Sequence, residues 1–293
     1  MTELSAGTDM KQPSQSWTTQ VAVSLLGRTS ARIGLSWIGL LVIIATFSPF
    51  LASSHPLYLV VDGQASSPLL QHMTPLDWVW LAGLPMILVI ALLPLPLWKK
   101  FLSAMVGLGL TAMIAYTVVS PPALVIYEQY RELEATGKVE TMIRAPIPYS
   151  AKDYLRDYAD TGIESPLLTS EQRIHWMGTD ENGADVASRM IHASRIALGI
   201  GFIATGIALV IGTIIGGLMG YFSGIVDIIG MRLVEIFEAI PTLFLLLSFV
   251  AFFGRSIYMM MVIIGITAWS GYARYVRAEF LKLRQQDFVQ AAV

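Results

Sequence analysis

Six stretches of apolar residues, separated by polar segments, dominate this chain. A helix needs ~20 mainly apolar residues to cross the hydrocarbon core of a bilayer. Such a segment is helical because every backbone N–H and C=O must be paired inside it. The pattern predicts membrane helices at roughly Ile33–Leu51, Trp78–Trp98, Phe101–Ser120, Ile196–Gly220, Leu233–Phe253 and Tyr258–Ala273. We therefore expect an all-α, polytopic membrane protein with about six transmembrane helices.

Prolines and short polar breaks refine these boundaries. Only Lys99 and Lys100 separate the second and third stretches, which predicts a tight helical hairpin. Pro94 and Pro96 blur the end of the second stretch, because proline cannot continue helical hydrogen bonding. Pro241 lies inside the fifth stretch and predicts a kink or break there.

The longest non-membrane part is residues 121–192, where we expect a small, loop-rich region. Short exposed helices are predicted at Tyr127–Lys138 and Lys152–Asp160, with prolines and a glycine between them. The resulting organisation is a polar tail, three spans, this loop region and a second membrane part, with boundaries at 1–32, 33–120, 121–192 and 193–293.

Lysine and arginine set the expected orientation, because they concentrate on the cytoplasmic side of membrane proteins. Basic residues precede the first span, fill the hairpin turn and cluster after Ala273, whereas residues 52–77 contain no lysine or arginine. The pattern predicts a cytoplasmic N-terminus, with 52–77 and 121–192 outside.

Composition excludes several classes of function. Hydrophobic residues make up 55% of the chain and the net charge is −2, which gives no reason to expect a nucleic-acid partner. There is no cysteine, and the four histidines are scattered without ligand spacing, so each is expected at a surface or interface rather than on a metal. No phosphate-binding loop or nucleophile elbow is present. We expect no cofactor, and a transporter or channel subunit rather than an enzyme.

The fourth stretch carries glycines at every fourth position, a spacing that places them on one helix face. Small residues in such a row let a neighbouring helix approach closely in lipid. We expect tight helix packing at Gly212, Gly216, Gly220 and Gly224.

Charged residues mark both ends of the last two stretches. Glu235 and Glu238 lie near the start of the fifth, where they complement the helix dipole or, in the sharper alternative, face a pathway. Residues 271–293 are basic and mildly amphipathic, which is typical of a helix at the cytoplasmic membrane surface. Their end, Gln290–Ala292, is small enough for another protein to come close; the alternative is a membrane-surface helix with no further role.

Four motifs resemble one family. His175–Arg189, HWMGTDENGADVASR, resembles the GTDxxGRDVxSR signature of the second permease subunit in bacterial oligopeptide and dipeptide ABC importers. Gly220–Arg232 is similar to that family's GYxGGxxDxxxMR, and Asp287–Ala292 to the start of its EAA loop. Val276–Leu281, VRAEFL, resembles the branch importing microcin-type and other short peptides. The matching signature residues are Gly178, Thr179, Asp180, Gly183, Asp185, Ser188, Arg189, Asp227, Arg232 and Pro241.

The resemblance implies a permease of the bacterial inner membrane that works with a second permease, two ATP-binding subunits and a periplasmic substrate-binding protein. Hydrolysis of ATP would belong to the separate subunits. Residues 279–292 would couple to them, with Glu279, Gln290, Ala291 and Ala292 as the contact residues. Residues 178–189 would form an outer segment leading into the core spans.

Several departures from the family pattern leave alternatives open. Ala184 replaces an arginine, Ala193 a glycine and Gln290 a glutamate, while Glu235 stands where aspartate is usual. The 78–120 hairpin is an addition, and the chain stops inside the EAA-like loop, so we expect a fragment or a truncated product. A permease for nickel or another small solute, and a non-transporting membrane scaffold, remain alternatives.

Overall fold

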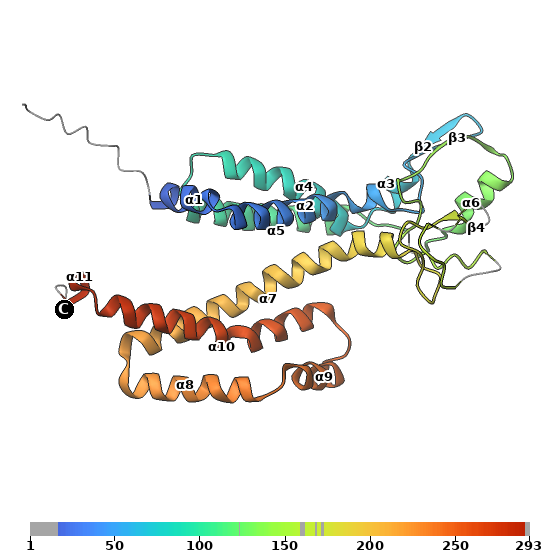
Figure 1. The fold of residues 1–293 in the computed structure, drawn as a ribbon. Coiled ribbons are helices and arrows are strands. Elements are labelled where there is room, and N and C mark those ends of the chain that lie inside the picture. Colours follow the sequence, from blue (N-terminus) through green and yellow to red (C-terminus); the bar gives the residue numbers. More distant parts are fainter. Residues whose placement is uncertain (1–16, 123, 159–161, 168, 171–172, 291–293) are drawn as a thin grey trace, which may run out of the picture. The chain divides into compact units, whose positions relative to one another are not determined.

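The computed structural model describes residues 17–122, 124–158, 162–167, 169–170 and 173–290. Its contacts divide the chain into two compact units, Met1–Ser150 and Ala151–Val293. Helices dominate both units, which confirms the all-α class (Figure 1).

In the first unit, three long helices follow the predicted apolar stretches. Helix α1 (Trp17–Gly27) leads into α2 (Thr29–Leu51), and the predicted hairpin is α4 (Pro75–Leu92) and α5 (Leu97–Val118). Helix α4 ends earlier than the apolar pattern indicated, because Pro94 and Pro96 follow it. A Cβ on Gly83 would lie 2.9 Å from the Leu108 side chain, so the two helices of the hairpin interdigitate.

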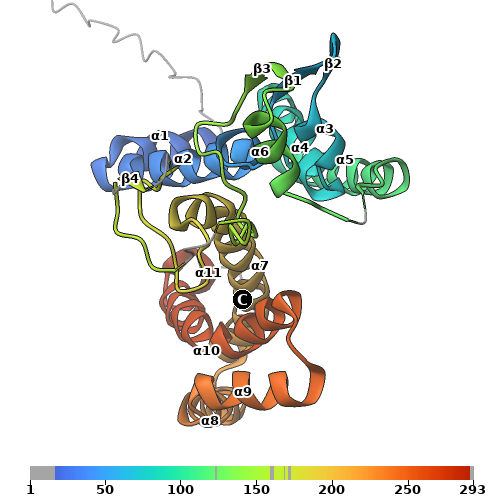
Figure 2. The same ribbon diagram turned by 90° about the vertical axis from the view of Figure 1, so that its right-hand side faces the viewer.

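A small sheet, which the sequence pattern did not predict, joins two loops of the first unit. Strand β1 (Tyr58–Val61) lies between β2 (Gln64–Ser66) and β3 (Val139–Ile143), antiparallel to both (Figure 2). The backbone N–H groups of Ser54 and Ser150 each donate to the other residue's hydroxyl, at 2.9 and 2.8 Å. The segment after α2 and the segment after α5 therefore lie side by side. Two short helices, α3 (Pro68–His72) and α6 (Glu128–Ala135), accompany the sheet.

One of the two short helices predicted in the loop region is present and one is not. Helix α6 lies inside the predicted Tyr127–Lys138. Residues 152–158, the described part of the other, form turns instead. Leu155 is buried there in the left-handed conformation, with φ 53°, and its N–H donates to Asp153 Oδ1 at 3.2 Å. The Asp153 side chain thus supports a turn in place of a helix.

Among its described residues, the second unit contains a short β4–β5 ribbon (Thr169–Ser170 and Arg173–Ile174) and five helices. The helices are α7 (Val186–Phe222), α8 (Gly224–Ala239), α9 (Thr242–Phe253), α10 (Ile257–Arg284) and α11 (Asp287–Gln290). Helices α8 and α9 are bent by 75° at the break that contains Pro241, so the prediction of a kink or break is confirmed.

By length and apolarity, the described helices account for four or five of the six predicted spans. Within the described residues, four helices, α2, α4, α5 and α7, are long and apolar enough to cross a membrane, and five if the bent pair α8–α9 is one span. Helix α10 includes the sixth predicted stretch but continues through its basic residues to Arg284. The sequence did not predict that the sixth stretch and residues 271–284 form one continuous helix. The location of the basic residues at the membrane surface stays a prediction.

Candidate functional site

Helices α7 and α10 run side by side in the same direction, with no room between them at three glycines (Figure 1). A Cβ on Gly212 would lie 2.9 Å from Trp269 O, one on Gly216 2.4 Å from Ala273 O, and one on Gly220 2.4 Å from Phe280 Cβ. Real Cβ atoms do not approach this closely, so these positions admit only glycine unless the helices move apart.

The contact continues toward the start of α7, where the glycine is on the other helix. A Cβ on Gly265 of α10 would lie 2.9 Å from Ala204 O and 2.7 Å from Ile207 Cβ. Gly224, placed in the same row by the sequence spacing, is not part of this contact. A Cβ there would have nothing within 4 Å, and the residue has a φ of +59°, so it serves the turn into α8.

The signature segment 178–189 folds into a tight loop that begins α7. Asp180 Oδ1 accepts hydrogen bonds from the backbone N–H groups of Asn182 and Ala184, at 3.0 and 2.8 Å, and Asp180 Oδ2 pairs with Arg189. Gly183 completes the turn with φ 82°. Ala184, at the position of the family's arginine, is fully buried.

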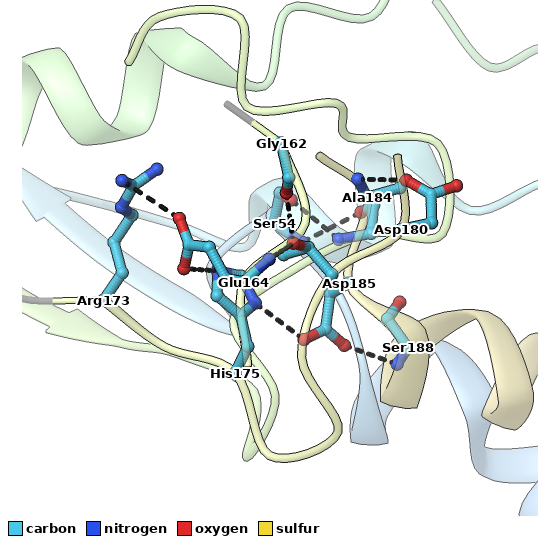
Figure 3. A network of polar contacts seen from close by, with 11 residues as sticks. Ser54, Gly162, Glu164, Arg173, His175, Asp180, Ala184, Asp185 and Ser188 are labelled. Atoms are coloured by element: carbon cyan, nitrogen blue, oxygen red, sulfur yellow. Dashed lines mark hydrogen bonds and ion pairs between the residues drawn. The ribbon is translucent and has the colours of Figure 1, made fainter. Parts of the chain in front are cut away.

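A second layer of polar contacts joins the loop to Gly162 and Glu164, and Glu164 to Arg173 (Figure 3). Thr179 Oγ1 donates to Gly162 O and accepts from the Glu164 N–H. Glu164 Oε1 lies 3.2 Å from Arg173 Nη2. A Cβ on Gly178 would lie 2.3 Å from Glu164 O, which explains the glycine and its φ of +74°.

A buried histidine links this layer to α7. His175 is fully buried, with Nδ1 2.8 Å from Asp185 Oδ2 and Nε2 3.7 Å from Glu164 Oε2. Asp185 is the N-cap of α7, because its Oδ1 accepts from the Ser188 N–H at 2.6 Å. The expectation that each histidine lies at a surface or interface is wrong for His175, and also for His55, which is 6% exposed.

Electrostatics at the loop favour an ionised Asp180. Burial of the carboxyl acts to raise its pKa, but hydrogen bonds from Ala184 and Asn182 and the charge of Arg189 outweigh it and hold the pKa below the usual range. The loop is therefore held together by a charged carboxylate.

Ion pairs join α8 to the last turns of α10. Arg277 donates from Nε to Asp227 Oδ1 and from Nη2 to Asp227 Oδ2, the latter at 2.6 Å. Arg274 pairs with Glu238. The Arg284 Nη1 donates to Ser223 Oγ at 2.6 Å. Glu235, by contrast, pairs with Arg232 on α8 itself, at 2.6 Å.

The expected ATPase-contact residues lie in or beyond the end of this helix. Glu279 is exposed on α10, 3.7 Å from Lys282 Nζ. Gln290 is the last residue of α11, and Ala291 and Ala292 lie outside the described residues. Within the described part of the chain, no group of three or more histidine, aspartate or glutamate side chains could hold a metal ion.

Sequence reasoning missed Glu164, His175 and Arg277 as structural centres. Arg277 was visible only as one charge of a basic cluster, and its partner is 50 residues away. The nearest signal was that Asp227 and Arg277 both lie in segments with family resemblance. Nothing local distinguishes Glu164 from a surface acid.

Comparisons with known proteins show which permeases this sequence resembles. Residues 212–293 match the family described as binding-protein-dependent transport system inner membrane component. Three curated relatives are the oligopeptide permease protein OppC of Haemophilus influenzae, the inner membrane ABC transporter permease YejE of Escherichia coli and the E. coli nickel permease NikC. OppC is 39% identical over 119 residues, covering 41% of this chain and 38% of OppC. YejE is 35% identical over 162 residues, covering 55% of this chain and 45% of YejE.

NikC is 36% identical over 136 residues, covering 46% of this chain and 49% of NikC. The chain thus spans less than half the length of each of these relatives. The resemblance inferred from the motifs is confirmed: this chain is similar to permease subunits of peptide ABC importers, and residues 212–293 match the inner membrane component of binding-protein-dependent transport systems.

Proposed function

We propose that this chain forms part of the membrane path of an ATP-binding-cassette importer for short peptides. The observation that carries the proposal is the α7–α10 pair, closely packed at Gly212, Gly216 and Gly220 and followed directly by the segment that resembles a coupling loop. In this proposal the closely packed α7–α10 pair is the fixed part, and the bent span α8–α9 beside it is the part that moves during transport.

The proposal includes the subunits that such an importer requires. They are a second permease, two ATP-binding subunits and a periplasmic substrate-binding protein. Glu279, Gln290, Ala291 and Ala292 would meet an ATP-binding subunit, and ATP would be hydrolysed there rather than on this chain. Ala291→Trp is expected to reduce co-purification of the ATP-binding subunits while leaving the amount of the chain in the membrane unchanged.

We also propose that the chain lies in the inner membrane with its N-terminus in the cytoplasm. The pairing of β1 with β3 supports this, because it brings residues 58–66 and 139–143 to one side of the α4–α5 hairpin. Lys99 and Lys100 follow the turn at the hairpin's other end, and the positive-inside rule assigns that end to the cytoplasm.

Uptake measurements in the native host test the proposal. Deleting the gene is expected to abolish uptake of labelled tripeptides, and the gene restored on a plasmid is expected to return it. Loss of nickel uptake with intact peptide uptake would favour the nickel alternative, which the similarity to NikC motivates. Loss of neither, with the chain present in the membrane, would favour the scaffold.

A further inference from the structure

Three side chains on one face of α10 contact the corner where α7 turns into α8. Arg277, Phe280 and Arg284 are three and four residues apart, so they lie on one helix face over two turns. They contact Asp227, Gly220 and Ser223 respectively. We call these six residues the corner clamp.

The ion pair in the clamp, between Arg277 and Asp227, is made of two hydrogen bonds with a fixed relative orientation. Nε and Nη2 of Arg277 meet the two different oxygens of Asp227, and the side chains are only 28% and 18% exposed. A two-pronged contact of this kind fixes orientation as well as distance. It therefore resists rotation of α8 about its own axis relative to α10.

The corner itself is built as a sharp, defined turn. Ser223, the single residue between the two helices, and Gly224, the first residue of α8, both have positive φ, 50° and 59°. Arg284 Nη1 donates to Ser223 Oγ at 2.6 Å and to Tyr221 O at 3.4 Å, so a cation lies at the carboxyl end of α7, where the helix dipole favours it.

The clamp lies between the proposed coupling segment and α8, a position suited to transmitting movement from one to the other. Arg284 is the last residue of α10, and α11, in the segment proposed to couple to the ATP-binding subunits, begins at Asp287. Asp227 is in the first turn of α8, whose far end meets the 75° bend. Apart from the clamp, α8 is held by Arg274–Glu238 and by Val234 in an apolar cluster with Met219, Trp269 and Ala273.

We propose that the corner clamp makes the end of α10 and the start of α8 one rigid body, so that displacement of the coupling segment moves the bent α8–α9 span. Asp227, Arg277 and Arg284 are positioning residues in this scheme. The inference rests on the proposed function, because it names the joint that would connect ATP hydrolysis to the transport path.

The test uses the assembled transporter in proteoliposomes, with tripeptide uptake and ATP hydrolysis measured on the same vesicles. Asp227→Asn and Arg277→Gln are each expected to lower uptake per ATP hydrolysed about tenfold, because a charge-assisted pair is lost. The ATP hydrolysis rate should stay within about twofold, because the ATP-binding subunits are separate. The exchange variant D227R/R277D is expected to restore much of the ratio.

Glu235→Gln is the matched control, since it removes the same charge from the same helix but breaks a pair internal to α8. Its ratio of uptake to hydrolysis should match the wild type. A second measurement links S223C to R284C with a short, cleavable bifunctional thiol reagent, in a chain that has no other cysteine. Uptake should survive the cross-link, because the clamp stays closed during the cycle.

The outcomes separate the two proposals. If the wild-type assembly takes up no peptide, the proposed function fails. If the wild type transports but D227N and R277Q keep its uptake per ATP, or if cross-linking stops uptake and cleavage restores it, the clamp is not the joint.

Discussion

Gly216 has no space for a side chain, because a Cβ there would lie 2.4 Å from Ala273 O and 3.0 Å from Val276 Cβ. Gly216→Val should force α7 and α10 apart and destabilise the pair by about 1–3 kcal/mol, the usual cost of overpacking. Gly206→Val is the control on the same helix, since nothing lies within 4 Å of that position. Thermal unfolding followed by tryptophan fluorescence in detergent measures the difference; equal midpoints for the two variants would contradict the close approach.

Asp180 gives the loop before α7 a defined pH dependence. Its pKa is lowered in the folded chain, so its contribution to stability is present above the unfolded-state pKa, about 3.9, and is lost as pH falls through the folded value. Asp180→Asn should therefore lower the unfolding midpoint at pH 7, and the gap to wild type should narrow as the pH falls below the unfolded-state pKa of about 3.9.

The measurement is the unfolding midpoint of both proteins across that range. Glu181→Gln is the control, because Glu181 is the neighbouring exposed acid in the same loop. A gap that stays constant with pH would mean that the carboxylate charge does not hold the loop together.

At the scale of elements, hydropathy was sufficient to predict most of the helices. Helices α2, α4, α5 and α7 follow the apolar stretches, and proline chemistry predicted the break at Pro241. The continuity of α10 from the last apolar stretch through the basic residues was not predicted, because Arg274 and Arg277 were interpreted only as a basic flank. Their partners, Glu238 and Asp227, lie on another helix, and pairing between distant residues leaves no local pattern.

For the candidate site, as for the helices, the sequence predicted local spacing but not contacts between distant residues. Spacing alone placed Gly212, Gly216 and Gly220 on one face, but their partner helix and the exclusion of Gly224 depend on contacts with a distant segment and on the turn into α8. The burial of His175 between Asp185 and Glu164 was not foreseen, because a scattered histidine gives no sign of burial. The sheet joining β1 to β3 was missed because its strands are short and more than 70 residues apart.

Pro241 should be the cause of the bend between α8 and α9. It supplies no N–H for a helical hydrogen bond and its ring clashes with the carbonyl four residues earlier. Pro241→Ala should straighten the pair, so that the distance between spin labels on I228C and V250C increases toward about 33 Å, the length of a continuous helix over that interval. Pro85→Ala, inside α4, is the control and should leave that distance unchanged. An unchanged distance in P241A would assign the bend to packing instead.

At the scale of the whole molecule, the β1–β3 pairing makes a prediction about sidedness. Strands that exchange hydrogen bonds must be on the same side of a membrane, so Gln64, next to β1, and Glu140, in β3, share a compartment. The Gly63 N–H in fact donates to Glu140 Oε1 at 3.0 Å. The α4–α5 turn must lie opposite, because each helix of the hairpin crosses once.

Because the chain has no cysteine, single cysteines can report this directly. In intact spheroplasts, Q64C and E140C should react with a membrane-impermeant maleimide, whereas L95C, in the α4–α5 turn, should react only after permeabilisation. Denaturation before labelling controls for burial, since all three must then react equally. Labelling of Q64C without E140C would contradict the sheet. Labelling of L95C alone would preserve the sheet and reverse the orientation, because the paired loops and the hairpin turn would have exchanged sides together.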